Sequence, residues 1–334
     1  MNSVLVILPP AIGDIMMAVP LLRILHAAGW RVDTVVDQGM AGLESAYAQY
    51  VHHQHLVPVK VWRARSLFYD ITGRLNFVTR IRKERYDVLI QVGTGSLGIW
   101  LTWAARIPVS VAQDVHHKVA VKRWAYRSVI THRVHVDDDH AAAENMTFAS
   151  ALGIAPMMQP PPPEARNSAS SWNVVIAPDA TQSGRTIPLS SVSHIIEGLK
   201  AVQQDLVITL IGTKGGVAER AAIAHGLATD HISCDLREVV GAIRSAGCVI
   251  AADSGIGHIA ATCGVPVVSI FGPGDPDKVR PWGNPQQLVV IRNRYPCQPC
   301  RANGCQNSGV SQCLTTLPIA NVVSQTMTFL GALT

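Results

Sequence analysis

The sequence has few charged side chains, few aromatic ones, and no uninterrupted apolar run long enough to span a membrane. Charged residues make up 15% and aromatic residues 5% of the 334 residues. Apolar residues reach 48%, which excludes a generally disordered chain. The longest membrane-like stretch, 95–112, contains Arg106 and Pro108, so we interpret it as a buried helix followed by a strand.

No internal repeat is visible, which argues against a solenoid or a propeller. No basic residue precedes the first apolar run, and Pro9, Pro10 and Asp14 soon interrupt the apolar character of the chain. We therefore expect no signal peptide and a cytoplasmic protein. The length suggests about two domains.

Short apolar runs alternate with longer amphipathic ones in the first half of the chain. Residues 4–8, 31–36 and 86–92 read as strands, and 14–26 as a helix. Strands that alternate with helices predict a parallel sheet with helices on both faces. This predicts a Rossmann-like domain at 1–155.

A proline-rich segment, 156–171, is predicted to be an extended linker. The same alternation then restarts and predicts a second doubly wound α/β domain at 172–318. A terminal segment, 319–334, is predicted to form a helix that crosses back to the first domain. Two such domains place ligands at the carboxyl ends of their strands, in a cleft between them.

Basic residues are concentrated in two stretches of the first half, within an overall charge of +5. Residues 60–85 contain eight Lys or Arg against Asp70 and Glu84, and 116–133 contain five and no acid. These stretches suggest an anionic partner, such as a phosphorylated glycan, a phospholipid surface or nucleic acid. The alternative is that each is a solvated helix face.

The turn after the first strand is the first segment that suggests chemistry. It reads Leu8-Pro9-Pro10-Ala11-Ile12-Gly13-Asp14. Gly13 permits close approach of a ligand, and Asp14 falls in the first turn of the helix. The alternative is that Asp14 only stabilises the helix end.

A second segment, Asp253-Ser254-Gly255-Ile256-Gly257-His258, joins a buried strand to a helix. Amides at such a helix N-terminus bind phosphate or diphosphate. Asp253 can accept hydrogen bonds from sugar hydroxyls, and His258 can face the same ligand. The alternative is a structural helix start with a core histidine. The loop Phe271-Gly272-Pro273-Gly274-Asp275-Pro276 ends the next strand and is predicted to lie beside it.

Together these three segments, in this order, resemble glycosyltransferase family 9, the ADP-heptose:lipopolysaccharide heptosyltransferases, over nearly the whole chain. The resemblance implies the two-domain GT-B architecture. It also implies inverting transfer of heptose from ADP-heptose to a sugar hydroxyl, with no cofactor. Asp14 would be the general base, and the helix start at 254–257 would hold the diphosphate. The implied acceptor is the anionic inner core of lipopolysaccharide, reached by a protein peripheral to the inner membrane.

The resemblance extends to two further donor-binding positions. The family usually has a lysine before a Trp-Pro pair, where this chain has Arg185, followed by Ile187 and Pro188. Arginine can bind phosphate with two hydrogen bonds, so the role can be kept. Glu219 corresponds to an acid that binds the nucleoside ribose, although a plain surface glutamate is the alternative.

Four cysteines occur close together in a polar loop, 297–313: Cys297, Cys300, Cys305 and Cys313. This spacing predicts a structural metal site, for zinc rather than iron. Free thiols, or disulfides formed after purification, are the alternative. His52, His53 and His55 lack partner ligands in the sequence and are interpreted as surface or strand residues. Asp137, Asp138 and Asp139 are interpreted as a loop before a helix at 140–152.

Several other functions stay open at this stage. A GT-B transferase could use another nucleotide sugar, or a protein or small-molecule acceptor. An epimerase of the same architecture would act on the nucleotide sugar without an acceptor. A non-catalytic binding protein is a third class, but the scarcity of aromatic residues and the lack of RNA-binding motifs argue against nucleic acid.

Overall fold

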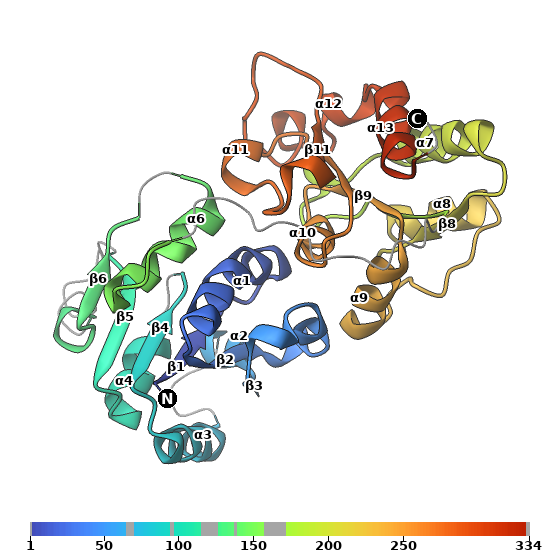
Figure 1. Cartoon of the computed structure of the whole chain (residues 1–334). Helices are drawn as coiled ribbons and strands as arrows, with labels where there is room; N and C mark the ends of the chain where they lie inside the picture. The colour runs from blue at the N-terminus through green and yellow to red at the C-terminus, as the bar shows by residue number, and fades with distance from the viewer. Residues whose placement is uncertain are drawn as a thin grey trace. The chain divides into compact units, whose positions relative to one another are not determined.

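The computed structural model describes residues 2–64, 70–93, 97–114, 126–136, 139–156 and 172–331. The chain divides into two compact units, Met1–Met158 and Gln159–Thr334. Each unit is an α/β structure built on its own parallel sheet (Figure 1). Most of the proline-rich segment 156–171 lies outside the described residues, as do 116–125, Asp137 and Asp138.

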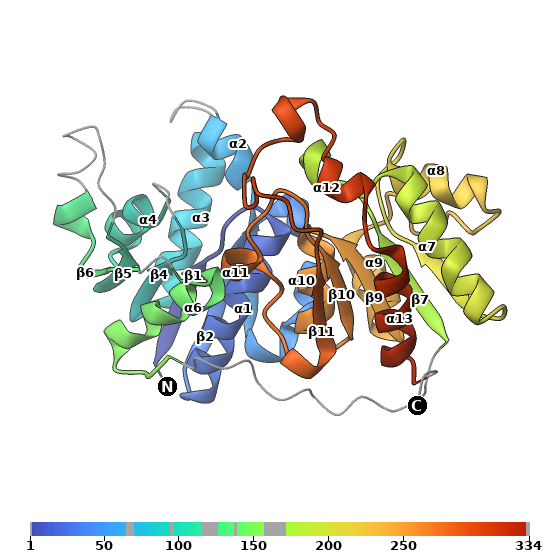
Figure 2. The same ribbon diagram turned by 90° about the horizontal axis from the view of Figure 1, so that it is seen from above.

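The first unit contains a six-stranded sheet with the order β3-β2-β1-β4-β5-β6, in which all neighbouring strands are parallel. The strands are β1 (Ser3–Ile7), β2 (Arg31–Asp37), β3 (His53–Val57), β4 (Val88–Gln91), β5 (Val109–Gln113) and β6 (His132–Val134). The described helices are α1 (Ile12–Ala27), α2 (Val59–Ala64), α3 (Ile71–Glu84), α4 (Leu97–Ala105) and α6 (Ala141–Met146). Figure 2 shows α3 and α4 on one face of this sheet and α1 and α6 on the other.

The second unit contains a five-stranded parallel sheet with the order β11-β10-β9-β7-β8. The strands are β7 (Asn173–Ala177), β8 (Val207–Leu210), β9 (Cys248–Ala252), β10 (Val267–Ile270) and β11 (Leu288–Ile291). The helices are α7 (Leu189–Val202), α8 (Val217–Ala224), α9 (Leu236–Ser245), α10 (Gly255–Thr262), α11 (Pro276–Val279), α12 (Gln312–Thr315) and α13 (Ile319–Phe329).

The hydrophobic sequence of the central strands explains why they form the cores. Every residue of β1 and of β9 is buried. A parallel strand covered by helices on both faces has no solvent side, so it reads as a continuous apolar run rather than an alternating one. This pattern made the central strands predictable, and the predicted α/β class with two parallel sheets is confirmed.

The strand order reverses once in each sheet, and ligands of open α/β sheets bind beside that reversal. In the first sheet it lies between β1 and β4, and in the second between β7 and β9. The turn that carries Asp14 follows β1, and Asp253 follows β9. The topology therefore puts both sequence motifs beside the expected binding positions of their own sheets.

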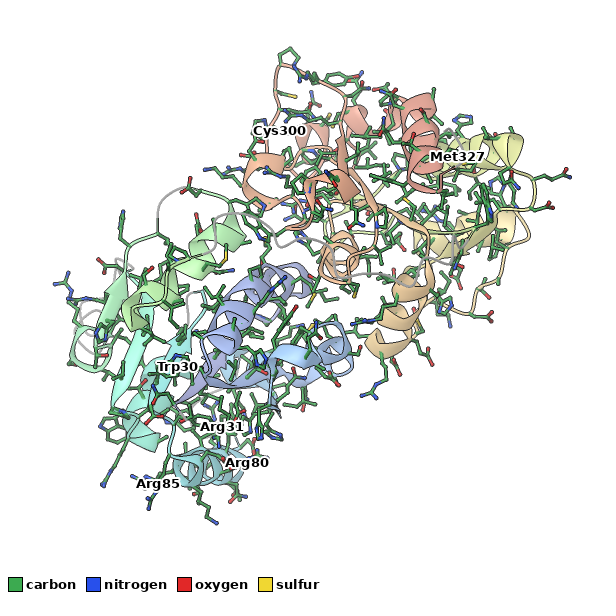
Figure 3. All side chains as sticks on the ribbon, viewed as in Figure 1. Trp30, Arg31, Arg80, Arg85, Cys300 and Met327 are labelled. Atoms are coloured by element: carbon green, nitrogen blue, oxygen red, sulfur yellow. The ribbon has the colours of Figure 1, made fainter. Side chains whose placement is uncertain are left out.

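Some predicted elements differ from the observed ones. The predicted helix at 140–152 ends as an α-helix at Met146 and continues as a 3₁₀-helix, Thr147–Leu152. The C-terminal helix α13 packs against α7, and Met327 on it belongs to the core of the second unit (Figure 3). Its predicted return to the first domain stays a prediction. Among the described residues no helix is both long and apolar enough to cross a bilayer.

Candidate active site

A pocket of about 170 Å³ lies at the start of α1 in the first unit and contains Asp14. Its apolar wall includes Met17, Val92 and Phe148. Asp14 remains exposed, although burial of the carboxyl group against its neighbours raises its pKa above the ordinary value. A solvent-accessible carboxylate with increased basicity is suited to accept a proton from a hydroxyl group.

Helix α1 begins at Ile12, two residues before the predicted start, so Gly13 and Asp14 both lie in its first turn. The residue before the helix is Ala11, and no side chain caps the helix there. The carboxylate also benefits from the positive end of the helix dipole.

Three polar residues of this pocket were missed by the sequence analysis: Gln113, Glu144 and Asn145. Glu144 and Asn145 lie on α6, which packs against α1. The side-chain amide of Asn145 donates a hydrogen bond of 3.1 Å to the carbonyl oxygen of Met17, which ties the two helices together at the pocket. No local sequence signal marks these two helix residues, because their contact with α1 is distant in sequence; Asn145 and Met17 are 128 positions apart.

The second unit brings two predicted donor-binding residues together. The guanidinium of Arg185 lies 3.3 Å from the carboxylate Oδ2 of Asp253. Arg185 comes from the loop after β7 and Asp253 from the end of β9, so the pair spans the reversal of strand order. Asp253 is 7% exposed, and burial raises its pKa while Arg185 acts in the opposite direction.

Helix α10 begins directly after Ser254 with an uncapped N-terminus. Ser254 occupies the N-cap position, yet its side chain caps no backbone amide. The Ser254 hydroxyl is buried and lacks a hydrogen-bond partner among the described residues, whereas Asp253 Oδ2 is held by its ion pair with Arg185. Uncapped amides beside an unsatisfied hydroxyl are what an oxygen-rich ligand requires.

Accessibility differs along this helix start. Ser254, Gly255 and Ile256 are partly exposed, whereas Gly257 and His258 are buried. A ligand can therefore approach the first three residues of this segment. The role predicted for His258 toward a ligand stays a prediction.

The loop after β10 lies against Asp253, as predicted. A Cβ added to Gly274 would come within 2.2 Å of the Asp253 carboxylate. A larger residue there would displace the Asp253 carboxylate, so Gly274 lets the two strand-end loops approach each other.

Glu219 lies on α8, where its carboxylate accepts a hydrogen bond of 2.6 Å from the amide of Gly215. The same turn is held by Asp179, which sequence analysis also missed and which accepts hydrogen bonds from the amides of Thr213 and Val217 at 3.1 and 2.7 Å. Glu219 thus has a structural partner, and its predicted contact with a ribose stays a prediction.

The loop 297–313 packs on the loop that carries Arg185. The side-chain oxygen of Asn303 accepts a hydrogen bond of 2.8 Å from the amide of Gly184, and the Ser311 hydroxyl donates one of 2.6 Å to the Gly184 carbonyl. Arg301 also forms an ion pair of 3.0 Å with Asp275 in the loop after β10. The cysteine-rich loop therefore supports two loops next to Asp253.

The predicted four-cysteine metal site stays a prediction. Across the described ranges, no three or more His, Cys, Asp or Glu side chains are grouped so that they could hold a metal ion. Cys297, Cys300 and Cys305 are exposed, whereas Cys313 is buried in the hydrophobic core of the second unit. Burial raises the pKa of Cys313, and the other three thiols add to that effect. Figure 3 shows Cys300 on the loop after β11.

The basic residues of the stretch 60–85 differ in their exposure and in their contacts. Arg74 is buried, stacks over Trp62 and donates a hydrogen bond of 2.9 Å to the Trp62 carbonyl, so it is structural. Arg80, Arg82, Lys83 and Arg85 are exposed at the end of α3. Figure 3 shows Arg80 and Arg85 at this end, and Arg31 is tied to it by an ion pair of 3.2 Å with Glu84.

The comparisons with known proteins agree with this organisation. The family model for glycosyltransferase family 9 (heptosyltransferase) matches residues 74–311 of this chain. The chain is 25% identical over 272 residues to lipopolysaccharide heptosyltransferase 3 of Escherichia coli, covering 76% of this chain and 78% of that protein.

Two solved structures share the fold. The E. coli ADP-heptose lipopolysaccharide heptosyltransferase II gives a TM-score of 0.73 at 18% identity, over 99% of this chain and 98% of that one. The iron-containing dodecameric glycosyltransferase TibC of enterotoxigenic E. coli gives 0.56 at 15% identity, over 100% of this chain and 77% of that one.

The two parallel-sheet units are those of the GT-B fold. The family match covers more than half of the chain and includes both Arg185 and the Asp253–His258 segment. The chain therefore belongs to glycosyltransferase family 9, the heptosyltransferases, and is a glycosyltransferase.

Proposed function

We propose that this protein is an inverting transferase that moves heptose from ADP-heptose to a sugar hydroxyl of the lipopolysaccharide inner core. The donor is inferred from the name of the E. coli enzyme that shares its fold, and the acceptor from its E. coli relative in sequence. The observation that carries the mechanism is Asp14, an accessible carboxylate with a raised pKa in a pocket at the strand reversal.

In the proposed reaction the Asp14 carboxylate takes the proton from the acceptor hydroxyl. The hydroxyl oxygen then attacks the anomeric carbon of heptose, and the bond from that carbon to the diphosphate breaks on the opposite face. A base in this position typically contributes about 10²–10⁴ in rate. Gln113, Glu144 and Asn145 offer hydrogen bonds to other hydroxyls of the acceptor.

The departing ADP acquires negative charge, which the second unit can stabilise. We propose that the amides of Ser254, Gly255 and Ile256 bind the diphosphate together with Arg185. Asp253 would bind donor hydroxyls, and Glu219 the ribose. These groups supply the charge stabilisation from the chain itself, so the proposed step uses no cofactor. Gly13 leaves room for the substrate at the start of α1.

The remaining proposals concern location. The exposed basic residues of the first unit suit an anionic, lipid-linked acceptor and a position at the inner face of the inner membrane. A structural zinc ion, or less favourably iron, at the four cysteines is a separate proposal, although no group of three or more candidate ligands is assembled within the described ranges.

The test is a panel of nucleotides and nucleotide sugars, scored by the rise in melting temperature. Ligands that bind the folded state raise it by mass action. ADP and ADP-heptose should stabilise the protein more than UDP- and GDP-sugars. In Gly255→Val the added side chain blocks approach to the amides, so the ADP shift should largely vanish while the unliganded melting temperature changes little.

Incubating ADP-heptose without acceptor provides the second measurement. The donor should remain unchanged until a lipopolysaccharide acceptor is added. A sugar that changes its configuration in the donor-only sample would instead identify an epimerase, and stabilisation by UDP-sugars alone would disprove the proposed donor.

A further inference from the structure

Helix α4 carries an apolar outer surface, which is unusual for a helix on the outside of an α/β unit. Its sequence, LGIWLTWAA, contains no charged residue. Trp103 is 73% exposed, and Ile99 and Trp100 are only half-buried. An indole exposed to this degree leaves a large apolar area in water.

Helix α3 adds two exposed apolar side chains beside it. Ile71 is 46% and Leu75 is 59% exposed. Glu84 on the same helix pairs with Arg31 of β2, so that flank of α3 faces β2. At about 100° per residue, Leu75 lies on the opposite flank of α3, and α3 packs against α4.

We call the set Ile71, Leu75 and Trp103 the α3–α4 surface. It is bordered by cations at the ends of both helices. Arg82 and Lys83 lie in the last turn of α3, and Arg85 and Arg106 directly follow α3 and α4. All four are exposed, and none forms an ion pair within the described part of the chain.

Acidic groups on these two helices do not offset this charge. Helix α4 has none, and the single acid of α3, Glu84, is bound to Arg31. Asp70, which precedes α3, accepts hydrogen bonds from Trp62 and Gly73. The combination of Trp and Leu with a border of Arg and Lys matches the interface of an anionic bilayer, where indole rings lie at the headgroups and cations pair with phosphates.

We propose that the α3–α4 surface docks on an anionic phospholipid bilayer, with Trp103 and Leu75 inserted among the headgroups. This assigns a surface to the membrane location suggested above and rests on the proposed function only for the presence of a membrane. A protein partner for this surface would need an apolar patch bordered by acids, and a second copy of the chain would bring cations against cations.

The test uses the full chain and sedimentation with vesicles of phosphatidylcholine, with and without phosphatidylglycerol. The wild type should bind the anionic vesicles, and added salt should weaken binding. The double variant Leu75→Gln/Trp103→Gln should bind at least about tenfold more weakly, because it loses the inserted apolar groups. Arg82→Gln/Lys83→Gln should lose part of the binding and part of its salt dependence.

Ile223→Gln is the matched control, because Ile223 is 70% exposed on α8 of the second unit. It should bind like the wild type. Circular dichroism checks the fold of each variant, and light scattering measures its mass. A wild type that does not sediment, a double variant that binds normally, or a dimer that Trp103→Gln dissociates would each overturn the proposal.

Heptose transfer to a soluble, delipidated acceptor separates this proposal from the proposed function. The double variant Leu75→Gln/Trp103→Gln should keep the wild-type kcat in that assay. If the wild type transfers no heptose yet still binds anionic vesicles, the proposed reaction fails and the docking surface stands. If transfer is normal and vesicle binding is absent, the docking surface fails and the proposed reaction stands.

Discussion

The guanidinium of Arg185 lies 3.3 Å from the buried carboxylate of Asp253, across the reversal of strand order in the second sheet. The side chain of Arg185 is 30% exposed, so one side of the guanidinium can still meet a ligand. The pair can therefore orient both a phosphate and a sugar hydroxyl. Because Asp253 is buried, its charge depends on this partner.

Arg185→Ala should reduce ADP affinity by at least about tenfold, since a charge-assisted contact to phosphate is lost. The ADP affinity of Arg185→Lys should lie between those of the wild type and Arg185→Ala, because lysine keeps the charge but cannot donate two parallel hydrogen bonds to one phosphate. Isothermal titration with ADP measures both. Arg244→Ala at the end of α9 is the control, and unchanged ADP binding in Arg185→Ala would remove this residue from the donor site.

Asp14→Asn should lower transfer by about 10²–10⁴ and leave ADP affinity within a few-fold. Because the folded-state pKa of Asp14 is raised, the ionised carboxylate is disfavoured in the fold at neutral pH. Asn removes that charge, so the melting temperature at neutral pH should not fall. Wild-type kcat should rise with pH as Asp14 ionises, and a variant that retains more than about a tenth of the turnover would show that Asp14 is not the base.

Glu144→Gln should raise the KM for the acceptor by about tenfold and change kcat less, because a carboxylate that binds hydroxyl groups acts on substrate binding. Glu144→Asp should recover part of the affinity. Steady-state kinetics with varied acceptor at saturating donor gives both constants. Equal KM values for the wild type and both variants would show that the acceptor does not contact Glu144.

His55 predicts a pH dependence of stability in the first unit. The phenol of Tyr86 donates a hydrogen bond of 2.6 Å to Asp33, so at 3.0 Å it can accept one from His55 Nε2. The other ring nitrogen, Nδ1, is buried and has no hydrogen-bond partner among the described residues. Burial and nearby positive charge lower the pKa of His55 to about 4.

The unfolded chain therefore binds this proton more readily than the fold does. The contribution of neutral His55 to the free energy of unfolding is complete above pH 6.5. It is lost as the pH falls toward 4, by about 3 kcal/mol in total. Denaturant unfolding at several pH values should show this loss in the wild type and a flatter profile in His55→Asn. Parallel profiles would contradict the assignment.

The cysteine loop predicts a pattern of thiol reactivity. Cys297, Cys300 and Cys305 should react quickly with a thiol reagent in the native protein, and Cys313 slowly, because it is buried with a raised pKa. Mass spectrometry of the labelled peptides assigns each site. Protection of all four thiols, together with about one equivalent of zinc or iron per chain, would confirm the predicted metal site.

The sequence predicted the features that depend on local pattern. The apolar runs of β1 and β9 predicted their burial, and the turns after these strands predicted where Asp14 and Asp253 would lie. The Arg185–Asp253 contact is also explained by topology, because both residues come after strands of one parallel sheet. The features that the sequence analysis missed depend on packing at a distance. Glu144 reaches the Asp14 pocket only because α6 packs on α1. Cys313 is buried because its helix, α12, packs against the core of the second unit.

The close backbone contact between Gly184 and the cysteine-rich loop limits how this enzyme can be engineered. A Cβ at position 184 would meet the backbone nitrogen of Gly304 at 2.1 Å. A loop grafted from another transferase to change donor preference would bring a side chain to that spot unless it also had glycine there. Arg185 and residues 303–304 therefore have to be redesigned as one block, because altering either loop alone would displace the other.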